Sequence, residues 1–316
     1  NFNQPINNWN VSNVTNMEEM FFGSVYNQAL NDWNVSNVTN MEEMFKNSAY
    51  DQPLNNWNVS NVTNMFRMFD GSVYNQPLND WDVSNVTYME DMFRYSSYNQ
   101  PLNDWDVSNV TYMEEMFRYS SYNQPLDNWD VSNVSGYNSF DGMFANSSFN
   151  QDISSWEITS NDLGEFVKNS AMDSQNYDLL LGRLVQLGLQ GGNLDTAGLE
   201  YCDLFTRQIL VEELSWVIYT DELGDDCNIN YITGKVRFDI NGDGCYDNDV
   251  ALSQVTVNTN DGQNDLSVIT DDQGDYLVTV NQGNFDVSML NLPNYLNAAP
   301  TSHNISFNST DELEDQ

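Results

Sequence analysis

Basic side chains are scarce in this chain. Its 316 residues include 9 Lys and Arg against 47 Asp and Glu, a formal net charge of −38. Nucleic-acid-binding proteins need basic residues to displace the counterions of the phosphates, so this class of partner is excluded. Anionic membrane surfaces repel a chain of this sign. No run of about 18 apolar residues occurs, so we expect no insertion into a membrane.

Residues for catalysis are also scarce. The sequence has one histidine, His303, with no orienting acid beside it. Adjacent glutamates such as Glu114 and Glu115 would diverge by about 100° on a helix, so they do not form a general acid and base pair. We therefore expect a protein that is not an enzyme. No signal peptide is visible, and Asn3-Gln4 matches a step inside the later repeats, so we expect at least one upstream repeat.

The composition favours a folded chain. Hydrophobic residues make up 40% of the sequence and aromatic residues 13%, with 8 Trp. An intrinsically disordered acidic chain would have far fewer. The length allows about two or three domains.

A repeat dominates the first half. Trp recurs at one constant interval, at positions 9, 33, 57, 81, 105 and 129, and then once more at 156 after a slightly longer interval. Self-similarity at such a period indicates supersecondary units that stack on one another. The extra residues of the last unit lie between Val134 and Phe144, where we expect a longer loop.

Two elements are expected in each unit. Thr111 and Glu114 have the spacing of a capping box, and Met113 and Met116 would share one face of the short helix that follows. The Leu-x-x-Trp-x-Val segment at residues 102–107 favours a short strand. The sequence therefore predicts an α/β repeat solenoid of the leucine-rich-repeat type, with the repeated Trp, Met and Phe in its core.

The repeat resembles a known family. The unit W-[ND]-V-S-N-V-T-x-M-x-x-M-F, followed by a [YF]-[ND]-Q step, is similar to the BspA-like leucine-rich-repeat surface proteins of bacteria and some protists. The resemblance covers residues 1–156. It implies exposure outside the cell and adhesion or protein binding.

The period disappears after residue 156. Leu180, Leu181 and Leu184 have helical spacing, and residues 199–217 read as a second helical stretch. Because a solenoid needs an atypical last unit to shield its core, residues 157–227 are predicted to be a helical C-terminal cap. The segment is similar to those that follow such repeats in secreted Bacteroidetes proteins. That similarity implies export by the type IX secretion machinery, through a C-terminal domain beyond residue 316.

The last third has β character. Alternating segments at residues 232–238, 254–257 and 276–280 are separated by turn signals, which predicts a small all-β sandwich over residues 228–310. Gly234-x-Val236-x-Phe238-Asp239 resembles the prealbumin-like, B-type domains of bacterial surface proteins, including staphylococcal serine–aspartate proteins. Residues 311–316 read as an acidic linker.

A calcium site is predicted in this β region. Oxygen ligands at alternate positions, with Gly244 at the sharp turn, are the pattern that a cation of calcium's size needs. The expected ligands are Asp239, Asn241, Asp243, the carbonyl of Cys245, Asp247 and Asp249. Val250 stands where an EF-hand has its bidentate Glu. An acidic turn without an ion is the alternative.

Two sets of repeat residues are candidates for ligand contact. Tyrosine is favoured at interfaces, which points to Tyr88, Tyr95, Tyr112 and Tyr119. The second set is the aspartates that follow Trp, namely Asp82, Asp106 and Asp130. Earlier repeats have Asn there, so the charge is not needed for the fold. A solvated acidic stripe is the simpler interpretation, with bound cations or a basic partner as alternatives.

The three cysteines leave the disulfide open. Cys202 with Cys227 is the favoured pair and suits an oxidising compartment, while Cys227 with Cys245 is the alternative. The sequence as a whole predicts a secreted or surface-displayed bacterial interaction protein that binds an extracellular protein or glycan along the solenoid, with a calcium-stiffened β spacer. Non-catalytic carrier modules of a larger surface hydrolase, or a structural surface-layer or filament component, are the rival hypotheses.

Overall fold

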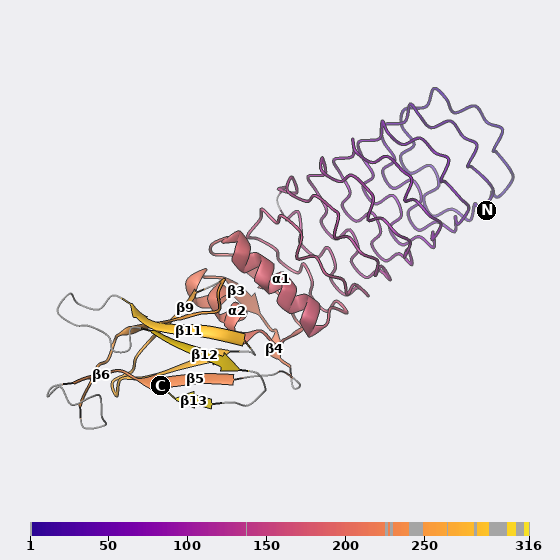
Figure 1. Cartoon of the computed structure of the whole chain (residues 1–316). Helices are drawn as coiled ribbons and strands as arrows, with labels where there is room; N and C mark the ends of the chain where they lie inside the picture. Colours follow the sequence, from indigo (N-terminus) through magenta and orange to yellow (C-terminus); the bar gives the residue numbers. More distant parts are fainter. Residues whose placement is uncertain are drawn as a thin grey trace. The chain divides into compact units, whose positions relative to one another are not determined.

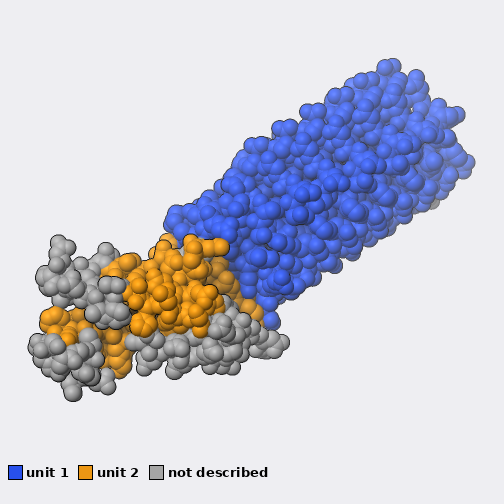
Figure 2. Space-filling view, viewed as in Figure 1, with its two compact units in different colours: residues 1–200, 214–222 blue, residues 201–213, 223–316 orange. Residues whose placement is uncertain are grey.

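The computed structural model divides the chain into two compact units (Figures 1 and 2). One contains residues 1–200 and 214–222, and the other contains residues 201–213 and 223–316. The residues that the structure describes are 2–136, 138–224, 227, 230–239, 249–263, 265–280, 283–290, 302–307 and 313–315.

The first unit begins as a stack of coils. Figure 1 places the N-terminus at the opposite end of this stack from helix α1 (Ser174–Leu187). Backbone hydrogen bonds join neighbouring coils: the amide of Met41 donates to the carbonyl of Asn64 (3.0 Å) and that of Phe45 to Met68 (2.9 Å). Parallel bridges link one equivalent position of successive coils, at Asn16, Asn40, Asn64, Tyr88 and Tyr112. One period of the sequence is therefore one coil.

The core of the stack consists of columns of identical side chains. The rings of Trp57 and Trp81 lie parallel with centroids 6.4 Å apart, and those of Phe45 and Phe69 are 5.6 Å apart. All four side chains are buried. The indole N–H of Trp57 donates to the carbonyl of Leu30 in the preceding coil at 2.9 Å, so burying its one polar atom leaves no donor unsatisfied. The expectation that these residues form the core is confirmed.

The predicted α/β solenoid is wrong. Within the described part of the repeats, the coils contain turns and single bridges in place of a helix and a strand. In the segment read as a strand, the amide of Trp105 donates to the carbonyl of Leu102 at 3.0 Å, which makes a turn. Trp105 and Val107 are buried with Asp106 exposed between them, as in an alternating strand, so this apolar pattern misled the assignment.

The capping-box spacing misled the helix assignment. Glu43, just beyond the expected cap, has a left-handed backbone with φ of 51°. Its amide donates to the carbonyl of Phe66 in the next coil (2.8 Å), and not to Thr39 four residues earlier. The turn is capped by Asn40, whose side-chain oxygen accepts a hydrogen bond from the amide of Glu42 at 3.1 Å. A left-handed residue and bonds between coils are incompatible with a helix here.

Helix α1 follows the coils. The side chain of Asp173 caps its first turn by accepting from the amide of Asn176 (2.9 Å), and Gly188 ends it in a left-handed conformation with φ of 64°. Its buried residues, at helical spacing, are Tyr177, Leu180, Leu181 and Leu184. This helix agrees with the apolar spacing in the sequence.

The predicted helical cap of residues 157–227 is nevertheless wrong. After α1 the chain forms β1 (Asn193–Asp195), which pairs in parallel with β3 (Val217–Tyr219), and the short pair β2 (Glu200–Tyr201) and β4 (Glu222–Leu223). Where a long second helix was expected, the structure has only α2 (Leu204–Gln208) and the π-helix η1 (Ile209–Glu213). Asp162 bridges Asn193 in parallel, so bonding between coils continues into β1.

The second unit contains small separate sheets where one β-sandwich was predicted. One sheet has the order β10-β5-β13, with β13 parallel to β5, one has the order β12-β11-β8-β9, and β6 pairs with β7. The strands of the first sheet are β5 (Asn230–Lys235), β10 (Asp275–Val280) and β13 (Leu313–Asp315). Those of the second are β8 (Thr256–Asn260), β9 (Asp265–Ile269), β11 (Gly283–Leu290) and β12 (Ser302–Phe307). The remaining pair is β6 (Arg237–Phe238) and β7 (Val250–Ala251).

The sandwich prediction is wrong because the expected strands are divided among small separate sheets. Between β5 and β6 the amide of Val236 donates to the carbonyl of Gly274, and its own carbonyl accepts from Leu252 (3.0 Å), so the chain changes partners at this residue. Among the described residues, no helix is long and apolar enough to cross a membrane.

Candidate functional site

Two positions in the turn of each coil have a left-handed backbone. The first holds charged residues in five successive coils: Glu19, Glu43, Arg67, Asp91 and Glu115. The second, one turn later, holds Gly23, Asn47, Gly71, Tyr95, Tyr119, Asn146 and Asn169. Because glycine and asparagine tolerate this conformation best, the two tyrosines are the exceptions.

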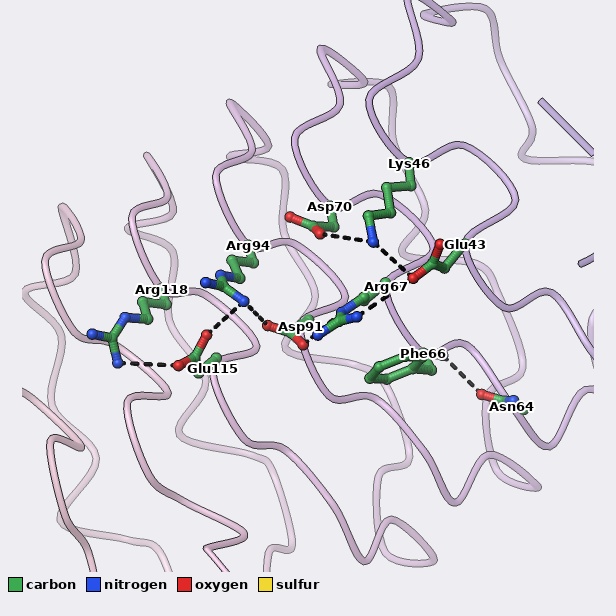
Figure 3. Close-up of polar contacts among 10 residues, drawn as sticks. All are labelled: Glu43, Lys46, Asn64, Phe66, Arg67, Asp70, Asp91, Arg94, Glu115 and Arg118. Carbon is green, nitrogen blue, oxygen red and sulfur yellow. Dashed lines mark hydrogen bonds and ion pairs between the residues drawn. The ribbon is translucent and has the colours of Figure 1, made fainter. Parts of the chain in front are cut away.

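A line of ion pairs runs along this edge of the stack (Figure 3). Successive nitrogen–oxygen distances lie between 2.7 and 3.5 Å in the order Lys46, Glu43, Arg67, Asp91, Arg94, Glu115, Arg118, Glu165, Lys168 and Asp195. We call these ten residues the charge ladder. It contains five of the nine basic residues of the chain and five acids, so its own charges balance in a strongly acidic protein.

The third coil reverses the order of its charges. Neighbouring coils have an acid followed by a base, as in Glu43 and Lys46, whereas the third coil has Arg67 followed by Asp70. Arg67 consequently lies between two acids, 3.5 Å from Glu43 and 2.9 Å from Asp91, and Asp70 lies 3.7 Å from Lys46. Burial opposes the charge of Arg67, but the hydrogen bond and charge of Asp91 outweigh it and raise the pKa of the guanidinium.

Tyrosines of successive coils form two stacked pairs, and the pair Tyr95 and Tyr119 lies beside Arg94 and Arg118 of the charge ladder. The rings of Tyr88 and Tyr112 are 5.1 Å apart and tilted by 4°, and those of Tyr95 and Tyr119 are 4.8 Å apart and tilted by 2°. Tyr95 is 53% exposed, and Tyr112 is the most covered of the four. We call these four residues the tyrosine stripe. The sequence singled out all four, and the structure brings them together as two pairs.

Tyr95 and Tyr119 occupy strained positions. Their φ angles are 53° and 56°, a conformation that costs an L-residue without local hydrogen bonding about 1–2 kcal/mol. Cation–π contacts offset part of this, because the guanidinium of Arg94 lies 5.0 Å from the ring of Tyr95 and that of Arg118 lies 5.4 Å from Tyr119. A bulky residue held at such a strained, exposed position is a candidate for a functional role.

A glycine fixes the end of the other pair. Gly136 follows Tyr112 in the next coil, and a Cβ at this glycine would clash with the Tyr112 ring. The absence of a side chain therefore lets the ring pack against the backbone, and Tyr112 is held between Gly136 and Tyr88.

The aspartates that follow Trp have a local role. The carboxylates of Asp82 and Asp106 each accept hydrogen bonds from the amide and hydroxyl of the serine two positions later, and Asp130 accepts from the amide of Ser132 at 3.0 Å. Hydrogen bonds from Ser132 hold the pKa of Asp130 below its usual value. Asn10 makes the same bonds to Ser12 in the first coil, so turn formation accounts for these side chains. Asp106 and Asp130 also line an open hollow with Asp104.

The predicted calcium loop is only partly described. Asn241, Asp243, Cys245 and Asp247 lie outside the described residues. Asp239 and Asp249 are described, and the pairing of Phe238 with Val250 across β6 and β7 brings these two ends of the loop opposite each other. Within the described ranges, no three His, Cys, Asp or Glu side chains cluster as metal ligands.

Cys202 and Cys227 form a disulfide, with Cα atoms 5.0 Å apart. This is the pair that the sequence favoured. It joins two residues of the second unit that are 25 positions apart in the sequence, and Cys202 lies just before α2.

Comparison with known proteins identifies the repeats. The chain matches the family described as "Mycoplasma protein of unknown function, DUF285" over residues 1–97 and again over residues 71–178. The chain belongs to the DUF285 family. The match is compatible with a BspA-like repeat protein and covers the coils of the first unit, but not the β region. No curated protein and no solved structure matches the chain.

Sequence reasoning missed two features of this DUF285 protein. It did not find the charge ladder, whose members come from many different coils and look like scattered surface charges in the sequence. It also missed the strain at Tyr95 and Tyr119. The signal was present, because the same column holds Gly23, Asn47 and Gly71, and an alternation of Gly and Asn marks a left-handed position.

Proposed function

We propose that this protein is a non-catalytic interaction module that binds an extracellular protein or polysaccharide along the tyrosine stripe. The observation that carries the proposal is the placement of Tyr95 and Tyr119 in left-handed positions while they stay 53% and 43% exposed. Other coils fill the same position with Gly or Asn, so folding does not require tyrosine there.

The surroundings of the stripe support a binding role. Stacking holds each pair in one arrangement, so little side-chain entropy is lost when a partner docks. Tyrosine also offers a large contact area and a hydroxyl that donates and accepts hydrogen bonds. The rest of the strongly acidic surface keeps the protein soluble and rejects acidic partners.

We further propose that the protein is secreted or displayed on the outer surface of a bacterial cell. The disulfide between Cys202 and Cys227 supports an oxidising compartment. Calcium bound between Asp239 and Asp249 would stiffen the β region as a spacer. Export by the type IX machinery is proposed only from the similarity of residues 157–227 to secreted Bacteroidetes proteins.

The test is a binding screen against arrays of glycans and of extracellular and cell-envelope proteins. The wild-type chain is compared with the double variant Tyr95→Asn/Tyr119→Asn, which restores the residue type found at Asn47 and Asn146. Tyr219→Asn is the matched control, because Tyr219 is equally exposed (52%) and lies in β3, outside the stripe.

We expect saturable binding that the double variant loses and the control keeps. Equal binding by all three proteins would place the ligand elsewhere on the chain. If no array component binds the wild-type protein, docking by this segment is rejected in favour of a spacer role.

A further inference from the structure

We propose that the partner of the tyrosine stripe is a basic protein segment, whose Lys or Arg side chains dock against Tyr88 and Tyr112 and pair with Glu90 and Glu114. This rests on the proposed function and narrows it to one class of partner. The proposal is based on one column of glutamates in the stack. In the first coils these glutamates accept a hydrogen bond from an asparagine of the next coil, and in the later coils that bond is missing.

In the early coils, each glutamate of this column is satisfied by an asparagine of the next coil. The side-chain amide of Asn40 donates to Glu18 at 3.3 Å, and that of Asn64 donates to Glu42 at 3.0 Å. The donor stands 22 positions after the acceptor in both cases. Each bond satisfies part of the hydrogen-bond acceptor capacity of the carboxylate.

The later coils keep the glutamates but not the donors. Tyr112 and Gly136 stand at the same separation after Glu90 and Glu114, where the earlier coils have asparagine. Neither carboxylate accepts a hydrogen bond from, or forms an ion pair with, any residue that the structure describes. Both side chains are nevertheless partly buried.

The charges around Glu90 favour an added cation. Burial and then the neighbouring Asp91 raise the pKa of Glu90, against the opposing effect of Arg67, while Glu42 raises it further. Arg67 is not available as a full counter-charge, because it already pairs with Asp91 and Glu43.

Glu114 has the same need. Burial raises its pKa, and the acids Asp141, Glu115, Asp91 and Glu90 raise it further. An additional cation is therefore the group that would stabilise the two carboxylates most.

The aromatic wall suits the same ligand. Tyr112 is fixed between Tyr88 and Gly136, so its ring is an immobile neighbour for an ammonium or guanidinium group. A cation beside a carboxylate and a tyrosine gains both a charge-assisted hydrogen bond and a cation–π contact. A neutral polysaccharide would leave the two carboxylates without a counter-charge, and an acidic partner would be repelled by the net charge of −38.

Spacing indicates the shape of the segment. The two tyrosine rings are 5.1 Å apart, which reflects the rise from one coil to the next in this column. Side chains at positions i and i+4 of a helix are about 5–6 Å apart, whereas residues on one face of a strand are about 6.6 Å apart. A basic helix lying along the stack therefore fits two successive glutamates better than an extended peptide.

The test measures binding of an alanine-based helical peptide with Lys at i and i+4, at about 0.15 M salt, by fluorescence anisotropy. The same peptide with Gln in place of Lys is the ligand control. The double variant Glu90→Gln/Glu114→Gln is compared with Asp82→Asn/Asp106→Asn, which removes the same net charge. Asn is native in the latter column at Asn34 and Asn58, so the control variant is expected to fold.

We expect the glutamate variant to lose about tenfold or more in affinity and the aspartate control less than about threefold. Equal losses in the two variants would mean diffuse attraction to an acidic surface and would overturn the proposal. Circular dichroism checks that both variants are folded.

A second variant tests the proposal without altering the two glutamates, so its result does not depend on whether the glutamate variant folds. Tyr112→Asn restores the donor that Asn40 supplies to Glu18, so we expect it to satisfy Glu90 internally and to weaken the lysine peptide. Unchanged binding by this variant would contradict the inference. If the arrays instead identify a neutral polysaccharide that needs Tyr95 and Tyr119 while the peptide does not bind, the proposed function stands and the basic partner is rejected.

Discussion

Reversal of the charges in the third coil should be essential to the stability of the stack. Exchanging them, as Arg67→Glu/Asp70→Arg, leaves the composition of charge almost unchanged. The new Glu would lie between Glu43 and Asp91, and the new Arg would face Lys46. Three attractive contacts, at 3.5, 2.9 and 3.7 Å, would become repulsive.

The size of the effect follows from burial. Two unit charges about 4 Å apart interact by about 4 kcal/mol at an effective dielectric of about 20, and exposed pairs are measured at about 0.2–1 kcal/mol. The side chains of Arg67 and Asp91 are 33% and 9% exposed, so we take about 1 kcal/mol for each contact. Neutralisation, as Arg67→Gln/Asp70→Asn, should then lower the free energy of unfolding by about 2–3 kcal/mol, and the exchange by about 4–6 kcal/mol.

Urea denaturation followed by Trp fluorescence measures both variants, since urea does not screen charge. The exchanged variant should unfold at lower urea than the neutral variant in low salt. In about 1 M salt the difference should shrink, because the Debye length falls to about 3 Å. Equal midpoints for the two variants in low salt would refute the argument that alternation of charge stabilises these coils.

Three further outcomes test other parts of the molecule. Replacing Tyr95 and Tyr119 by Asn should change the free energy of unfolding by less than about 1 kcal/mol, because relief of two left-handed tyrosines offsets one stacked pair and two exposed cation–π contacts. A loss above about 2 kcal/mol in urea denaturation would show that the rings are structural. Cys202→Ser should destabilise the second unit by about 2–4 kcal/mol, seen as a lower melting temperature than the wild type under non-reducing conditions. The same melting temperature for both would contradict this. Asp239→Asn should weaken calcium binding about tenfold or more in isothermal titration, and absence of any calcium heat with the wild-type chain would reject the site.

The sequence predicted the buried columns, which depend on the period of the repeat. It missed the turns of the coils, which depend on backbone angles and on hydrogen bonds between coils. The constant step of Trp correctly gives buried columns, since identical apolar residues at one spacing must stack to be buried. The Thr-x-x-Glu spacing suggested a helix because this pattern of side chains is typical of a helix start. The pattern contains no information about the backbone angles that decide between a helix and a turn. The left-handed φ of Glu43 and the bond from its amide to Phe66 could not be read from it. Helix α1 was predictable because Leu180, Leu181 and Leu184 fall on one face.

The candidate site divides in the same way. The tyrosines could be proposed from their residue type, but their pairing required the coil geometry. Glu90 and Glu114 could not be singled out from the sequence. They differ from Glu18 and Glu42 only in that the next coil has no asparagine to donate a hydrogen bond to them. That comparison needs the bond from Asn64 to Glu42 to be known first.

The charge reversal at Arg67 and Asp70 has a consequence for folding. The coils are so alike that the chain could slip by one whole repeat during folding, pairing each coil with the wrong neighbour while still burying its Trp and Phe. If the third coil were left out of the stack, Glu43 would face Asp91. Lys46 would likewise face Arg94, so like charges would meet in both columns. The reversal therefore distinguishes the third coil from its near-identical neighbours. It disfavours a misaligned stack that would still bury the hydrophobic core.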